Sequence, residues 1–92
     1  MDMTDTPAAK GFEFPTNMVV IAVGPATLEF RAAIESALID AGVQRTAEPI
    51  SARESRGGHY LSVHVPVYFA SREAMQVAYA AINEVPGLRF KF

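Results

Sequence analysis

A stretch near the middle of the chain holds the residue types that a strand for RNA recognition requires. In order along the chain they are a basic residue, a glycine, an aromatic residue and an apolar residue, namely Arg56, Gly57, Tyr60 and Leu61. An exposed ring stacks on a base, and a stacking platform needs two or three rings on the two central strands of a sheet. Gly58 stands where a second ring would be. A single-stranded RNA-binding module that uses the Tyr60 strand is therefore retained only as an alternative.

Two histidines in or near that stretch are of the residue type that binds metals or acts as a general base. His59 and His64 are five positions apart, in a turn and a strand, so they would project from opposite faces. No third ligand follows at the spacing of a metal site, and no nucleophile lies beside either histidine. We therefore predict no catalytic residues, no metal and no cofactor, and we interpret both histidines as surface side chains.

Two short segments have the chemistry to hold an anion or a partner. One is a loop before a predicted helix, where free backbone N–H groups can bind a carboxylate or phosphate. Its candidate ligand residues are Gly24, Pro25, Ala26 and Thr27. The other is a hairpin, with the candidate contacts Arg53, Ser55, Arg56 and Gly58. Each segment also has a structural interpretation, the loop as a turn with a helix cap and the hairpin as a solvated turn.

Composition restricts the class of protein. The 92 residues suit one domain, and half of them are hydrophobic, which supports a single packed core. There is no cysteine, which excludes disulfides and thiolate metal sites and fits a reducing cytoplasm. The formal net charge of -2 gives no overall attraction to phosphate backbones or anionic lipid, so nucleic acid is a disfavoured partner.

The N-terminal segment differs from the rest of the chain. Residues 1–11 carry Asp2 and Asp5 and lack the basic start and apolar run of a secretion signal, so we expect a flexible tail. No apolar run in the chain approaches the ~20 residues that span a bilayer. We therefore expect a cytoplasmic protein without a membrane span, with one domain over residues 12–92.

Four strands are predicted from the apolar spacing. Residues 18–23 (MVVIAV) are apolar throughout, as in a buried central strand, and residues 60–69 alternate apolar and polar side chains in a second long strand. Residues 43–55 are mostly polar and contain Pro49, which suits a sheet edge. A last strand over 88–92 is expected to bury its three large apolar side chains, Leu88, Phe90 and Phe92.

Two amphipathic helices are predicted from apolar residues that recur three and four positions apart. Thr27 caps the first and Gly42 ends it, whereas Ser71 caps the second. The first apolar face comprises Phe30, Ala33, Ile34, Ala37, Leu38 and Ala41. The second comprises Met75, Ala78, Tyr79, Ile82 and Val85.

The resulting order is strand, helix, strand, strand, helix, strand. With right-handed crossovers this order predicts an α+β, ferredoxin-like βαββαβ sandwich, with two helices on one face of a four-stranded antiparallel sheet in the order 4-1-3-2. The other face is left uncovered, with apolar side chains of residues 18–23 at its centre. Around them we place the candidate interface residues Tyr60, Ser62, His64 and Tyr68. Because exposed apolar faces mark interfaces, we predict a homodimer or a partner protein on this face, with sheet extension at an edge strand as the other route.

A small hydrolase on this fold is a second alternative. Acylphosphatases have this fold and rely on an arginine cradled in the first loop, beside a glycine-rich phosphate-binding turn. No arginine lies between Phe14 and Phe30, and the turn at Gly24 is short for a phosphate cradle. We therefore predict that the protein is not an enzyme.

Several short motifs are spread along the chain: Phe14-Pro15, Gly24, Ala26-Thr27, Glu29-Phe30, Ser55, Gly58, Tyr60, Ser62-Val63 and Ser71-Arg72-Glu73. As a set they resemble the YbeD-like family, small bacterial domains whose function is not established. The resemblance covers about residues 12–92 and implies the same βαββαβ fold, which is similar to ACT regulatory domains. Those domains sense amino acids and pair with other subunits.

The resemblance implies a non-enzymatic interaction or regulatory domain that senses a small anionic effector in an ACT-like manner. The loop at Gly24 is the equivalent of the effector loop. No catalytic residues carry over, because the family offers none. The hairpin departs from the family, whose members often have a second serine and a lysine where this chain has Arg56 and Gly57.

Overall fold

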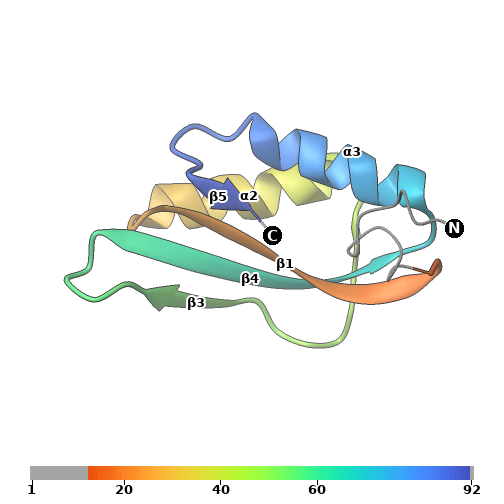
Figure 1. Ribbon diagram of the computed structural model, residues 1–92, viewed down its shortest axis with the longest axis horizontal. Helices are drawn as coiled ribbons and strands as arrows, with labels where there is room; N and C mark the ends of the chain where they lie inside the picture. Colours follow the sequence, from red (N-terminus) through yellow and green to blue (C-terminus); the bar gives the residue numbers. More distant parts are fainter. Residues whose placement is uncertain (1–12, 92) are drawn as a thin grey trace, which may run out of the picture.

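Two long antiparallel strands form the centre of the sheet. The computed structural model describes residues 13–91, and within them β1 (Thr16–Pro25) pairs with β4 (Tyr60–Phe69) along its whole length. Short strands flank this pair: β2 (Gln44–Arg45) and β3 (Ser51–Glu54) lie beside β4, and β5 (Phe90–Lys91) lies beside β1. The helices α2 (Leu28–Asp40) and α3 (Arg72–Asn83) cover one face of the sheet (Figure 1).

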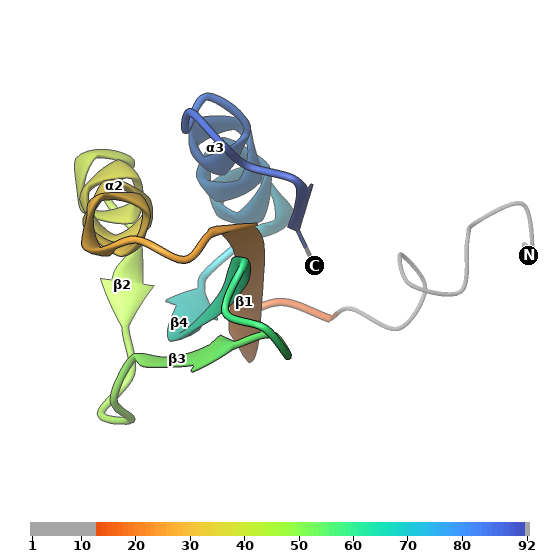
Figure 2. The same cartoon turned by 90° about the vertical axis from the view of Figure 1, so that its left-hand side faces the viewer.

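The predicted ferredoxin-like sandwich is confirmed. Across the sheet the order is β5, β1, β4 and then β2 with β3, which is the predicted order with the second strand in two pieces. Seen along the helices, both lie on the same side of the sheet (Figure 2). The predicted tail, residues 1–11, lies outside the described residues.

Pro66 explains why the second strand is split. On β4, only Val65 and Pro66 separate the part paired with β2 from the part paired with β3. The connection from β2 to β3 is longer, because it takes residues 46–50. Proline has no N–H to donate, so a regular ladder is lost at Pro66. Its carbonyl still accepts from the Thr46 N–H at 3.4 Å, and the chain bulges outward around it.

The core lies between the helices and the sheet, and both predicted helix faces point into it. Helix caps are as predicted, because the Phe30 N–H donates to the Thr27 Oγ at 3.0 Å and the Ala74 N–H to the Ser71 Oγ at 3.1 Å. Gly42 ends α2 with φ 77°. The buried apolar residues are Val20, Ala22, Phe30, Ile34, Leu38, Val63, Val65, Val67, Phe69, Ala78, Ile82 and Val85.

The last strand corrects the sequence prediction. Leu88 packs partly buried against the core, but Phe90 is 59% exposed and lies opposite Val23. The reason is an irregular contact with β1, because the Arg89 N–H donates to the Val23 carbonyl at 2.8 Å. Arg89 and Phe90 thus both lie opposite one residue of β1, as the two residues of a β-bulge do. The alternation of inward and outward side chains along the last strand therefore shifts by one residue. Phe92 lies outside the described residues.

Candidate functional site

The face of the sheet that carries no helix is the first candidate surface. Side chains alternate along a strand, and since Val20 and Ala22 point into the core, their neighbours Val19, Ile21 and Val23 point outward. Directly opposite residues share a face, which assigns the same side to their partners on β4. We call this the open face: Asn17, Val19, Ile21, Val23, Tyr60, Ser62, His64, Pro66 and Tyr68. The four predicted interface residues therefore do lie on one face.

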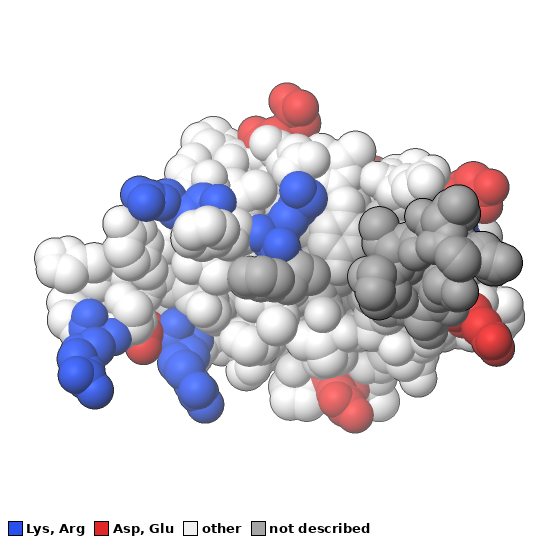
Figure 3. Space-filling view, in the orientation of Figure 1, with Lys and Arg blue, Asp and Glu red and all other residues white. Residues whose placement is uncertain are grey.

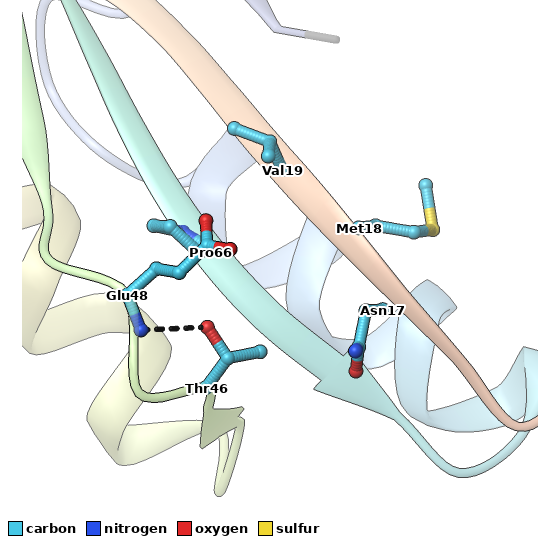
Figure 4. A pocket seen from close by; sticks show the side chains of 6 residues that line it. All are labelled: Asn17, Met18, Val19, Thr46, Glu48 and Pro66. Carbon is cyan, nitrogen blue, oxygen red and sulfur yellow. Dashed lines mark hydrogen bonds between the residues drawn. The ribbon is translucent and has the colours of Figure 1, made fainter.

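The centre of the open face is apolar and shallowly hollowed. Val19 is 46% exposed, although it sits in the middle of a central strand. A hollow of about 240 Å³ borders it, lined by Asn17, Met18, Val19, Thr46, Glu48 and Pro66 (Figure 4). Its lining combines apolar side chains of the two central strands with polar side chains of the segment 46–48.

Arg45 holds that segment against the sheet. Its Nε donates to the Pro66 carbonyl at 3.1 Å, and its Nη2 donates to the Glu48 carbonyl at 2.8 Å. The Glu48 N–H donates to the Thr46 Oγ at 3.2 Å, which closes a tight turn (Figure 4). Pro66 is consequently buried, although it belongs to the open face.

Two of the predicted hairpin contacts stabilise the turn, and the other two are exposed to solvent. Ser55 is structural, since its Oγ accepts from the Tyr60 N–H at 3.0 Å and its own N–H donates to the Tyr60 carbonyl at 2.8 Å. Gly58 has φ 74° and donates to the Ser55 carbonyl. Arg53 and Arg56 are exposed, and neither has an ion-pair partner within the described part of the chain.

A second group of residues at the same end was not predicted. The Arg89 guanidinium lies over the ring of Tyr60, 5.0 Å from its centroid, and Phe90 and Lys91 follow directly. Figure 3 shows Lys and Arg side chains gathered over the half of the molecule that holds the β3–β4 turn and β5. We call this set the hairpin-end cluster: Arg53, Arg56, Tyr60, Arg89, Phe90 and Lys91. The lone signal in the sequence was Arg89 and Lys91 flanking an aromatic residue.

The predicted ligand loop borders a different hollow. Gly24 and Pro25 belong to β1, and Gly24 packs against the ring of Phe30. Ala26 and Thr27 line a hollow of about 330 Å³ whose other walls come from α2 and from the hairpin strands, namely Leu28, Arg31, Ala52, Glu54 and Leu61. The loop and the hairpin therefore meet across one hollow, on the helix side of β3.

Two observations bear on chemistry and membrane insertion within residues 13–91. No group of three or more His, Asp or Glu side chains there could hold a metal ion. None of the helices described is long and apolar enough to cross a bilayer. Burial raises the pKa of the Tyr79 phenol above its ordinary value of 10.0. Its ring packs against Phe69, which is a structural role.

A comparison of sequences identifies the family of this chain. A family model with the description "Protein of unknown function (DUF493)" matches residues 9–92. The chain belongs to the DUF493 family. The resemblance to YbeD-like domains of unknown function is thereby confirmed.

DUF493 relatives occur in several bacteria. A UPF0250 protein of Stenotrophomonas maltophilia is 31% identical over 80 residues, covering 87% of each chain. UPF0250 proteins of Xanthomonas axonopodis and Xylella fastidiosa are 28% and 27% identical over 90 residues, covering 98% of each chain. These relatives carry no stated activity.

Solved structures resemble this DUF493 domain in fold. The ACT domain from the GTP pyrophosphokinase of Chlorobium tepidum superposes with a TM-score of 0.69 at 8% identity, covering 85% of this chain and 96% of that one. The C-terminal domain of the MgtC protein from Mycobacterium tuberculosis superposes with a TM-score of 0.63 at 13% identity, covering 88% and 87%. At these identities the likeness shows the fold alone.

Proposed function

We propose that this DUF493 domain is a non-enzymatic interaction module that pairs with a second copy of itself through the open face. The observation that supports this is the exposed apolar centre of that face. Val19 is 46% exposed on the uncovered face, where an antiparallel sheet commonly presents polar side chains to water. Large exposed apolar patches usually mark a binding surface.

A second copy fits the chemistry of the centre. Val19, Ile21 and Val23 carry no charge, and the β4 residues opposite them are Pro66, His64 and Ser62. A two-fold axis brings identical patches together, so an uncharged apolar strip can face itself without repulsion. The ACT-like fold is compatible with pairing, because two sheets can stack face to face about 10 Å apart with the helices outside.

Replacing Val19 with glutamate is expected to weaken self-association by at least about tenfold, because each copy would bury a carboxylate against its twin. Sedimentation velocity over a series of concentrations measures the change. Val77→Glu is the matched control, since Val77 is 52% exposed but lies on α3, on the other side of the molecule. A wild-type protein that stays monomeric at every concentration would contradict the proposal.

A second candidate function is the sensing of a small anion at the hollow beside Thr27. The N–H groups of Leu28 and Glu29 start α2 and have no acceptor among the residues described, whereas those of Phe30 and Arg31 are bonded to Thr27. Arg31 also lines the hollow, with its Nε bonded to Glu35 at 3.1 Å. Its other guanidinium N–H groups are available to an anion.

Inorganic phosphate is the probe for that site. In an NMR titration the amide resonances of Leu28 and Glu29 are expected to shift together, and Arg31→Ala is expected to weaken the effect about tenfold because it removes the charge. Arg72→Ala, at the start of α3, is the control. If phosphate leaves both amides unmoved, or Arg72→Ala has the same effect as Arg31→Ala, the hollow is not the site.

A further inference from the structure

We propose that the hairpin-end cluster binds single-stranded nucleic acid, with its arginines on phosphates and its two aromatic rings under bases. The proposal uses Arg53, Arg56, Arg89 and the rings of Tyr60 and Phe90, none of which lies at the apolar centre. Tyr60 and Phe90 also point to the open face, so nucleic acid would compete with a second copy that covers the whole of that face.

Charge is distributed unevenly over the molecule. Four of the seven described Lys and Arg residues belong to the cluster, and Glu54 is the acidic residue in the same hairpin. None of the four forms an ion pair within residues 13–91. The overall charge of -2 therefore hides a local basic surface, which is the electrostatic requirement for phosphate contacts.

The structure supplies the second ring that the sequence lacked. Tyr60 is opposite Pro25 on one side of β1, and Phe90 is opposite Val23 on the other side. Both point to the open face, with 38% and 59% of their surface exposed. The sequence analysis disfavoured RNA because Gly58 left Tyr60 without a second ring, and the shifted alternation of β5 places Phe90 on the same face.

The arginine on Tyr60 adds to the stacking surface. Arg89 lies 5.0 Å over the ring, and a guanidinium plane can itself carry a base or contact a phosphate. Tyr60 and Phe90 are two strand spacings apart across β1 and two residues apart along it, about 12 Å in total. A single strand with splayed bases can cover such a distance, whereas a paired duplex keeps its bases inside.

These features favour a nucleic acid over an acidic peptide. Cations alone attract either polymer, but exposed aromatic rings flanked by cations add base stacking, which tolerates any sequence. Arg53 lies opposite Ser62 on the open face, beside the rings, so its phosphate contacts and the bases lie on one side, whereas Lys91 lies opposite Ala22 and so belongs to the helix side. An acidic peptide would use the cations and leave Phe90 without a partner.

Fluorescence anisotropy with labelled oligo(dT) and oligo(U) tests the proposal. If Arg53, Arg56 and Arg89 contact phosphates, the affinity is expected to fall about 20-fold between about 50 and 200 mM salt, from a slope of about −0.7 per contact. Tyr60→Ala and Phe90→Ala are each expected to weaken binding about tenfold, and Arg53→Ala to make the salt dependence shallower. Tyr60→Phe retains the ring and should bind as wild type.

Arg72→Ala is the matched control. Arg72 also lies over an aromatic ring, that of Phe14 at 5.5 Å, but outside the cluster, so binding should be unchanged. Thermal melts establish that each variant is folded. Absence of binding at low salt overturns the proposal. So does binding that is unchanged in Tyr60→Ala and Phe90→Ala, or an oligonucleotide that oligoglutamate displaces as well as unlabelled oligonucleotide does. The dimer test measures the sedimentation of Val19→Glu, whereas this test measures oligonucleotide binding. Failure of one proposal is therefore distinguishable from failure of the other.

Discussion

Replacing Phe69 with alanine is expected to lower the free energy of unfolding by about 3–5 kcal/mol. Phe69 ends β4, is 1% exposed, and its ring centroid lies 6.5 Å from that of Tyr79. Alanine would leave a cavity between the sheet and α3 that the packed surroundings cannot fill. Because native proteins have about 5–15 kcal/mol in total, this loss is a large fraction of the stability. Urea denaturation followed by circular dichroism measures the change.

Phe90→Ala provides the matched control for that experiment. It removes the same side chain from β5, where 59% of the surface is already in water, so the expected loss is within about 0.5 kcal/mol. The pair of variants thus tests the corrected face assignment directly. Equal losses for the two phenylalanines would mean that Phe90 is buried after all.

Regular segments were predictable because one periodicity runs through each of them. Residues 60–69 alternate without interruption, so the inward set Val63, Val65, Val67 and Phe69 was recognised and is buried. The helix ends were equally clear, since Thr27 and Ser71 have the cap geometry that their hydroxyl groups suggest. With these elements known, the rule that crossover connections are right-handed predicts the strand order of the sheet.

Irregular segments were not predictable from local patterns. Pro49 was recognised as an edge signal, but the residue that splits the strand is Pro66, on the neighbouring strand. Its effect depends on which neighbour its missing N–H would face, and that requires the sheet register. The bulge at Arg89 is similar, because it arises from a hydrogen bond to Val23, a residue far away in sequence.

The candidate sites show the same division. Tyr60, Ser62, His64 and Tyr68 share a face because they lie two or four positions apart on one strand, which the sequence alone predicts. Arg89 over Tyr60 joins two strands that flank β1 and could not be found from spacing. The meeting of Thr27 with Glu54 across one hollow likewise depends on how α2 crosses the hairpin strands.

Gly24→Ala is expected to destabilise the domain by about 1–3 kcal/mol, although it adds one methyl group. A Cβ at this position would overlap the Phe30 ring atoms Cε1 and Cζ, and would lie 2.8 Å from Cδ1. Phe30 cannot easily move, because it is buried and its N–H is bonded to the Thr27 Oγ at 3.0 Å in the first turn of α2. Thermal and urea denaturation give the size of the loss.

A second substitution separates this clash from backbone strain. Phe30→Leu makes room for the new methyl group, so the double variant Gly24→Ala/Phe30→Leu is expected to lose at least about 0.5 kcal/mol less than the two single losses together. Gly42→Ala is the control, since Gly42 has φ 77° and no atom within 4 Å of a built Cβ. Its loss comes from the left-handed backbone alone and should not be relieved by Phe30→Leu. Additive losses at Gly24 would show that contact with Phe30 is not the reason for a glycine near the end of β1.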